Sequence, residues 1–301
     1  MPSLDDLRKR IASVKSTQKI TKAMKMVAAA KLRKAQEMAE KGRPYSEKMD
    51  VIIQNLSKAI SDPLNAPRLL VGTGEDKTHL CIVMTADRGL CGGFNTNIVK
   101  QAKNYFNKIL KDSKNLKIIT VGTKGLDQLK RDYGKYIIKK INFKNKKKLS
   151  FEDAESIGNE IVKLFKNKEF DKCVIFFNKF KNVMTQVPQT QQVIPAKQEE
   201  QSKKDEHSSY EFEPEEDEIL EDLLPKNIST QIYKGFLENS ASEQGSRMTA
   251  MDNATRNAGD LVEKLTINYN RSRQAAITKE LIEIISGAES LWWVKMEKLF
   301  K

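Results

Sequence analysis

The segment LDDLRKRIASV, from Leu4 to Val14, carries the pattern that decides the fold of this chain. Its apolar residues follow each other at spacings of 3, 4 and 3, and they are Leu4, Leu7, Ile11 and Val14. Heptad spacing of this kind puts a narrow apolar line along a helix, and two such helices pack their lines together. The segment therefore predicts a coiled-coil helix at the start of the chain.

Continued strictly, the same spacing meets polar residues. It reaches Gln18, Thr21 and Lys25, whereas the apolar residues nearby are Ile20, Met24 and Val27. Because an α-helix has 3.6 residues per turn and drifts against a 3.5-residue repeat, we expect the apolar line to move to the second set. The helix is predicted to cover the first sixty residues, with a kink or short break at Gly42 and Pro44.

The C-terminal part repeats this pattern. Spacings of 3 and 4 connect seven residues, namely Met248, Met251, Thr255, Ala258, Val262, Leu265 and Tyr269. Further on, the line meets Ser272 and Ala276, and we expect a neighbouring apolar line to replace it, through Ile277, Leu281, Ile284, Ala288 and Leu291. Two helices of this kind at opposite chain ends predict an intramolecular antiparallel coiled coil.

Between the two ends, short apolar runs alternate with helical patterns. Strands are predicted over 79–85, 116–122, 136–141 and 172–178, helices over 95–110, 125–133 and 151–166, and an edge strand over 183–194. This alternation is typical of a mainly parallel sheet with right-handed crossovers. The predicted fold class is α/β, with a long antiparallel coiled coil of N- and C-terminal helices plus a Rossmann-like α/β central domain.

We expect three domains. They are an N-terminal coiled-coil helix over 1–62, a central α/β domain over 63–225 and a C-terminal coiled-coil helix with a short tail over 226–301. The central domain includes an acidic, partly mobile segment over 195–222. Its part YEFEPEEDEILEDLLP, residues 210–225, leaves two interpretations open: a solvated turn leading into a helix, or an electrostatic footprint for a basic partner.

Composition limits the possible functions. The formal net charge of +13 raises nucleic acid as a partner, so a nucleic-acid-binding coiled-coil protein is the alternative function, although a solvated lysine-rich face accounts for the charge as well. No apolar run approaches the roughly 20 residues that cross a bilayer. The N-terminus lacks the pattern of a signal or transit peptide. We expect the three cysteines to be reduced and buried, and the two histidines offer little for a metal or catalytic site.

A glycine-rich stretch, TADRGLCGGFN from Thr85 to Asn95, lies between a predicted strand and a predicted helix. It matches neither phosphate-loop pattern. We interpret it as a closely packed turn with Asn95 as the helix N-cap and with a local pair of Asp87 and Arg88. The sequence thus predicts no catalytic residue, no cofactor-binding residue and no metal site.

Three blocks together resemble the γ subunits of F-type ATP synthases of the bacterial type. They are IASVKSTQKITKAMKMVAAAKLRKAQ (11–36), MTADRGLCGGFN (84–95) and ASEQGSRMTAMDNATRNAGDLVEKLTINYNRSRQAAITKELIEIISGA (241–288). The blocks stand in the order and at the separations usual for the family, and the resemblance covers nearly the whole chain. One departure is the continuation LWWVKMEKLFK after residue 290, which leaves two interpretations open: a helical extension of the C-terminal helix, or a segment that folds aside.

The resemblance implies a central rotor stalk that couples ion-driven rotation of the c-ring to ATP synthesis in the catalytic β subunits. A single copy would stand inside a hexamer of α and β subunits, contact the ε subunit and the c-ring, and have no catalytic site of its own. It would be peripheral, at the cytoplasmic face of the bacterial inner membrane, and would reach the membrane only through the c-ring.

Site residues follow from the same resemblance, position by position. Contacts with the β subunits are implied for Met24, Lys25, Arg247, Arg273, Gln274, Thr278 and Glu280. Contacts with the c-ring are implied for Phe212, Glu213 and Pro214.

Overall fold

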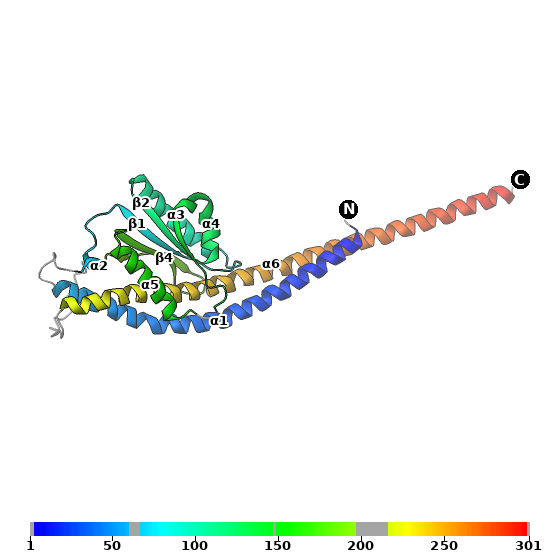
Figure 1. The fold of residues 1–301 in the computed structure, drawn as a ribbon. Helices are drawn as coiled ribbons and strands as arrows, with labels where there is room; N and C mark the ends of the chain where they lie inside the picture. The colour runs from blue at the N-terminus through cyan, green and yellow to red at the C-terminus, as the bar shows by residue number, and fades with distance from the viewer. Residues whose placement is uncertain (1–2, 60–66, 147–148, 197–215, 300–301) are drawn as a thin grey trace. The chain divides into compact units, whose positions relative to one another are not determined.

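The computed structural model describes residues 3–59, 67–146, 149–196 and 216–299 (Figure 1). Two long helices, α1 (Leu4–Ala59) and α6 (Glu216–Leu299), stand at the ends of the chain, and a five-stranded sheet lies between them in sequence. This arrangement confirms the predicted α/β class with long terminal helices. The predicted c-ring residues 212–214, and most of the acidic segment, lie outside the described residues.

The sheet has the strand order β3-β2-β1-β4-β5. Its strands are β1 (Thr78–Met84), β2 (Asn115–Val121), β3 (Ile137–Ile141), β4 (Lys172–Phe180) and β5 (Gln186–Ile194). The first four pair in parallel and β5 pairs antiparallel with β4, so the predicted edge strand is confirmed. In β1 every residue after Thr78 is buried, as expected for a central parallel strand covered on both faces.

Helices cover both faces of this sheet. On one face, α3 (Phe94–Lys111) and α4 (Thr123–Tyr133) enclose a core that includes Phe106, Leu129 and Phe176. On the other face, α5 (Phe151–Lys166) and the first half of α6 enclose a second core with Ile161, Ile175 and Ile232. The short elements α2 (Arg68–Val71) and η1 (Gly134–Tyr136) complete the connections.

Both edges of the sheet carry residues that discourage further strand pairing. Strand β3 exposes Lys139 and Lys140 at one edge. Strand β5 contains Pro188, which has no N–H to donate, at the other edge. Charged side chains and proline are the usual means of protecting free sheet edges.

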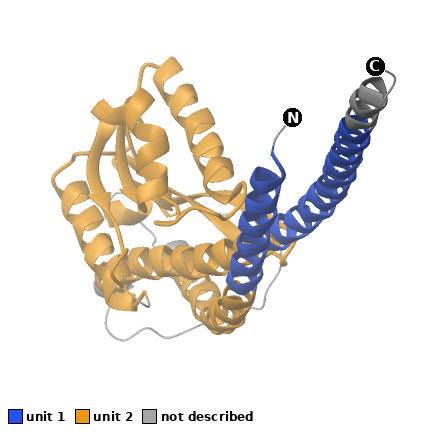
Figure 2. Cartoon of the chain, turned by 90° about the vertical axis from the view of Figure 1, so that its right-hand side faces the viewer, with its two compact units in different colours: residues 1–25, 251–301 blue, residues 26–250 orange. Residues whose placement is uncertain are grey.

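The chain divides into two compact units (Figure 2). Unit 1 combines residues 1–25 with 251–301, and unit 2 comprises residues 26–250. Each unit contains a pair of antiparallel helix segments. In unit 1 Lys25 contacts Asp252 and Gln18 contacts Thr255, and in unit 2 Arg43 contacts Glu238.

Burial along α1 keeps the strict 3–4 spacing, so the predicted shift of the apolar line is wrong. In unit 1, Gln18, Thr21 and Lys25 are half-buried, whereas Ile20 is 58% exposed. In unit 2 Val27 is 55% exposed, and the buried positions are Ala28, Leu32, Ala39, Ser46, Met49, Ile53 and Leu56. The helix keeps the 3.5-residue repeat because the polar residues find partners across the seam.

Of the predicted kink or short break in α1, the break is wrong, because the helix continues through Gly42 and Pro44. Gly42 is a position of close approach. A Cβ added there would lie 2.9 Å from Leu237 Cδ1 of α6, so the missing side chain lets the two helices of unit 2 come together. Likewise α6 begins at Glu216 and runs through Pro225, before the position where the sequence predicted its start.

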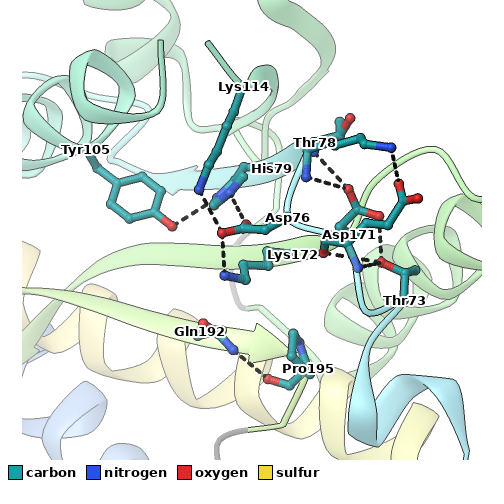
Figure 3. Close-up of polar contacts among 12 residues, drawn as sticks. Thr73, Asp76, Thr78, His79, Tyr105, Lys114, Asp171, Lys172, Gln192 and Pro195 are labelled. Carbon is teal, nitrogen blue, oxygen red and sulfur yellow. Dashed lines mark hydrogen bonds and ion pairs between the residues drawn. The ribbon is translucent and has the colours of Figure 1, made fainter. Parts of the chain in front are cut away.

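Polar side chains tie the amino ends of the parallel strands together (Figure 3). The carboxylate of Asp171 accepts hydrogen bonds from the Thr73 hydroxyl at 2.6 Å and from the Thr78 amide at 2.9 Å. Asp76 pairs with Lys114 at 2.7 Å and with Lys172 at 2.9 Å. Burial opposes the charged form of Asp76, but these hydrogen bonds outweigh it and hold the pKa of the carboxyl group well below its usual range.

His79 is the buried member of this group. Its Nε2 lies 2.7 Å from Asp76 Oδ1, and its Nδ1 lies 3.1 Å from the Tyr105 hydroxyl, which places the ring proton on Nε2 when the ring is neutral. Burial lowers the pKa of His79, and the contact with Asp76 opposes this effect without cancelling it.

This burial predicts a pH dependence of stability. Because the pKa of His79 is lower in the folded chain than its ordinary 6.5, the unfolded chain binds a proton first as the pH falls, and stability is lost below about pH 6.5. We expect the free energy of unfolding in urea to fall between about pH 7 and pH 5. His79→Gln should flatten this dependence, whereas His207→Gln should retain it. Equal flattening by both variants would contradict the assignment.

A second prediction concerns Gly122, which joins β2 to α4. Its φ is +96°, and a Cβ there would lie 2.2 Å from the carbonyl oxygen of Thr85. We expect Gly122→Ala to lower the free energy of unfolding by about 2–4 kcal/mol. The matched control is Gly74→Ala, where φ is +75° but nothing lies within 4 Å. Its cost should be about 1 kcal/mol. Similar losses for both variants would show that backbone strain alone matters.

Candidate functional site

Four of the predicted β-contact residues lie together on α6 in unit 1. They are Arg273, Gln274, Thr278 and Glu280, and all are exposed. Thr278 Oγ1 donates to the carbonyl oxygen of Gln274, one turn earlier on the same helix, at 3.0 Å. Their polar groups therefore stand on a stretch of helix surface that is open to a partner.

Large aliphatic side chains share this stretch. Five of them are 49–67% exposed, namely Ile277, Leu281, Ile282, Ile284 and Ile285. The side chains of the expected apolar line, such as Ile277 and Leu281, are therefore not buried within this chain. The prediction that this line continues the seam is wrong. Among the α6 positions whose burial is described, which end at residue 288, the last half-buried ones are Ser272 and Ala276, on the strict 3–4 spacing. We call residues 273–285 the C-terminal α6 surface.

The helix itself continues beyond this surface. It reaches Leu299, so the backbone of the tail is helical as far as the structure describes it. Contiguous exposed apolar side chains of this size are uncommon on chains that act alone, and they mark interaction sites. In the described ranges, no helix combines the length and the apolar character that crossing a membrane requires.

Met24 and Lys25 lie in the helix pair of unit 1 and are both half-buried. Lys25 Nζ is 2.5 Å from Asp252 Oδ1, and Arg256 approaches the other oxygen of the same carboxylate, also at 2.5 Å. The hydrogen bond from Lys25, and then that from Arg256, lowers the pKa of Asp252. The ammonium group of Lys25 is therefore already paired with an acidic residue of this chain.

Arg247 lies in unit 2, where its side chain is only 12% exposed. It pairs with Glu243 at 2.6 Å and donates to the carbonyl oxygen of Gly89 at 3.4 Å. Burial raises the pKa of Glu243, while the guanidinium of Arg247 opposes this effect. One turn of α6 thus holds the glycine-rich loop, because Ser246 Oγ also donates to the carbonyl oxygen of Cys91, at 2.7 Å.

The glycine-rich loop uses its polar groups internally. Asp87 accepts from the amides of Thr123 and Phe143, each at 2.9 Å, rather than forming the expected pair with Arg88. Asn95 accepts from the amide of Ala86 at 2.9 Å and donates to Cys91 Sγ at 3.2 Å. Since α3 begins at Phe94 with Gly93 as its N-cap, Asn95 binds the loop instead of capping the helix, and that prediction is wrong.

Sequence reasoning missed a network that joins α1, β4 and α6 in unit 2. Arg43 Nε lies 2.7 Å from Glu238 Oε1, and the amide of Phe180 donates to the other carboxylate oxygen at 2.8 Å. The Glu238 side chain is only 3% exposed. A signal was present in the sequence, because glycine at a seam position, as at Gly42, indicates two helices close enough for such a contact.

The two arginines of the predicted set should behave differently in the isolated chain. Arg247→Ala leaves Glu243 without its ion pair, and we expect the free energy of unfolding to fall by about 1–3 kcal/mol. The exposed Arg273 is the control, and Arg273→Ala should change stability by less than about 0.5 kcal/mol. Denaturant unfolding of both variants gives the comparison. A loss at Arg273 as large as that at Arg247 would contradict the placement of the two side chains.

Comparisons with known proteins support the resemblance. Residues 3–291 match the family described as ATP synthase. The chain is 72% identical to the ATP synthase gamma chain of Pelagibacter ubique over 97% of this chain and 100% of the relative. Identity with the gamma chain of a Jannaschia species is 55%, over 97% and 100% of the two chains.

Solved structures agree in fold. A chain of the central stalk and c-ring of the Tetrahymena thermophila mitochondrial ATP synthase aligns with a TM-score of 0.59 at 27% identity, covering 78% of this chain and 99% of that one. A chain from the OSCP/F1/c-ring structure of the Euglena gracilis mitochondrial enzyme gives 0.68 at 22% identity, over 96% and 94%. The alternative of a nucleic-acid-binding protein gains no support from these comparisons. Sequence and fold together place the chain in the family of ATP synthase gamma chains.

Proposed function

We propose that the chain is the central rotor stalk of a bacterial F-type ATP synthase. In this role it turns with the c-ring inside the hexamer of α and β subunits and couples ion flow to ATP synthesis in the β subunits. The observation that carries the proposal is the C-terminal α6 surface, where five large aliphatic side chains are about half or more exposed. Family membership and the likeness to a solved central stalk support the same role.

Exposed aliphatic side chains of this number gain free energy when a partner covers them, at roughly 25 cal/mol per Å² of apolar area. Their distribution matters as well. Since residues 281–288 are exposed all around the helix, a partner can contact any side of it. That is the property a sleeve around a turning shaft requires. A rotor acts by packing better against one conformation of each β subunit than against another at each angle.

We also propose that the β contacts divide into two kinds. Arg273, Gln274, Thr278 and Glu280 are exposed and available for direct contact. Lys25 and Arg247 are bound to acidic residues of this chain, so any effect on the β subunits passes through the helices that they stabilise. Met24 is half-buried beside Lys25 and belongs to the first helix block of the resemblance.

ATP chemistry belongs to the β subunits in this proposal, and the chain has no catalytic site of its own. The support is that the glycine-rich loop, which lies between a strand and a helix as a nucleotide-binding loop would, uses its polar groups in internal hydrogen bonds. Phe212, Glu213 and Pro214 are proposed to meet the c-ring, with the ε subunit nearby. The chain is proposed to lie at the cytoplasmic face of the membrane. Residues 1–62 and 226–301 are proposed to form the coiled-coil shaft, and residues 63–225 the α/β domain nearer the membrane.

The C-terminal α6 surface offers a direct test. Ile284→Asp puts a charge where the sleeve must cover an apolar side chain, so ATP synthesis by the complex reconstituted in vesicles should fall at least about tenfold. The control is Ile138→Asp, at a 46% exposed isoleucine of the sheet edge strand β3. Neither change should alter the unfolding of the isolated chain by more than about 0.5 kcal/mol. Normal coupled synthesis by the Ile284→Asp enzyme would overturn the proposal.

A further inference from the structure

In unit 1 the seam between α1 and α6 contains a run of polar contacts between apolar positions. The hydroxyl oxygens of Thr21 and Thr255 lie 2.8 Å apart. One turn along, Lys25 pairs with Asp252 at 2.5 Å. Buried apolar residues accompany them on the same spacing, with Met251 4% and Ala258 8% exposed.

A fifth member completes this group. Gln18 Nε2 reaches towards the carbonyl oxygen of Thr255 at 3.5 Å. On the facing helix, a Cβ added at Gly259 would lie 3.0 Å from that same Nε2, so the glycine makes room for the amide. We call Gln18, Thr21, Lys25, Asp252 and Thr255 the polar layer.

The apolar positions alone do not determine how the helices are aligned. In an antiparallel pair that sets Thr21 against Thr255, Val14 comes opposite Val262, and both are half-buried. A slide by one heptad would set Val14 against Tyr269 and would still match the apolar line. The same slide would put Thr21 against Val262 and Lys25 against Ala258. The hydroxyl, ammonium and carboxylate groups would then lose the contacts that they make across the seam, whereas Asp252 would keep Arg256 on its own helix.

We propose that the polar layer fixes the axial register of α1 against α6. Polar residues at seam positions select one register of a coiled coil at some cost in stability. The charged pair adds a smaller preference for the same register, since Lys25 and Asp252 are partly exposed and a slide would separate them. The residues of the layer are positioning residues and need not touch another subunit.

The axial register of the two helices determines which part of α6 has no α1 residue opposite it. With Thr21 against Thr255, the first residue of α1, Leu4, comes opposite Ser272, which is among the last half-buried positions of α6. The C-terminal α6 surface begins at the next residue. A slide of one heptad would move this surface by about 10 Å relative to α1, at 1.5 Å per residue. The significance for coupling rests on the proposed rotor function, but the register itself does not.

The test measures register directly in the full-length chain by disulfide formation. One cysteine replaces Val14, and the second replaces Val262 for the observed register or Tyr269 for the shifted one. The native cysteines are buried and do not compete. We expect the Val14→Cys/Val262→Cys pair to oxidise at least about tenfold faster than the Val14→Cys/Tyr269→Cys pair, in keeping with a register preference of about 1.4 kcal/mol.

Removal of four members of the polar layer should weaken this preference. In a chain with Thr21→Val, Thr255→Val, Lys25→Met and Asp252→Leu, the ratio of the two rates should fall at least about threefold while the chain stays folded, because apolar residues replace both members of each pair. A matched control, Ile11→Ala, weakens the apolar seam and should leave the ratio unchanged. An unchanged tenfold ratio in the fourfold variant would overturn the proposal. Since no partner subunit is needed, failure of the rotor proposal would leave this measurement intact.

Discussion

The strict alternation of three and four residues between buried positions of α1 is the constraint on which the rest of the structure depends. It holds from Leu7 in unit 1 to Leu56 in unit 2, through both apolar and polar residues. A single helix has no reason to keep a 3.5-residue repeat, because its own geometry favours 3.6 residues per turn. The repeat persists because a second helix faces it throughout, and α6 supplies that helix in each unit.

Close approach between helices is what makes the specific contacts possible. In unit 2, Gly42 allows the backbone of α1 near Leu237, and Arg43 then reaches Glu238 and the end of β4. In unit 1, Gly259 gives Gln18 its space. The turn of α6 that carries Glu243 and Arg247 also binds the glycine-rich loop between β1 and α3. The helices and the sheet of unit 2 therefore form one packed body rather than separate pieces.

Sequence alone predicted the sheet well and the seams poorly. Strands such as Thr78–Met84 can be recognised because a buried parallel strand is a continuous apolar run, and their alternation with helices predicts a mainly parallel sheet. The seam was misjudged because hydrophobicity was used to find it, whereas Gln18, Thr21 and Lys25 are half-buried through their partners. A contact between residues more than two hundred positions apart leaves no local trace. Arg247 shows the same limit, since its motif suggested a partner subunit but its nearest partners are Glu243 and Gly89.

The two protected edges of the sheet affect how the chain behaves before it assembles with other subunits. Before a chain meets its partners, open strand edges can pair with those of other copies and form aggregates. Lys139 and Lys140 on β3, and Pro188 on β5, make both borders poor templates for such growth. The exposed aliphatic side chains of the C-terminal α6 surface thus stand on a helix, whose backbone hydrogen bonds are satisfied within the helix, while both sheet edges discourage pairing with other copies.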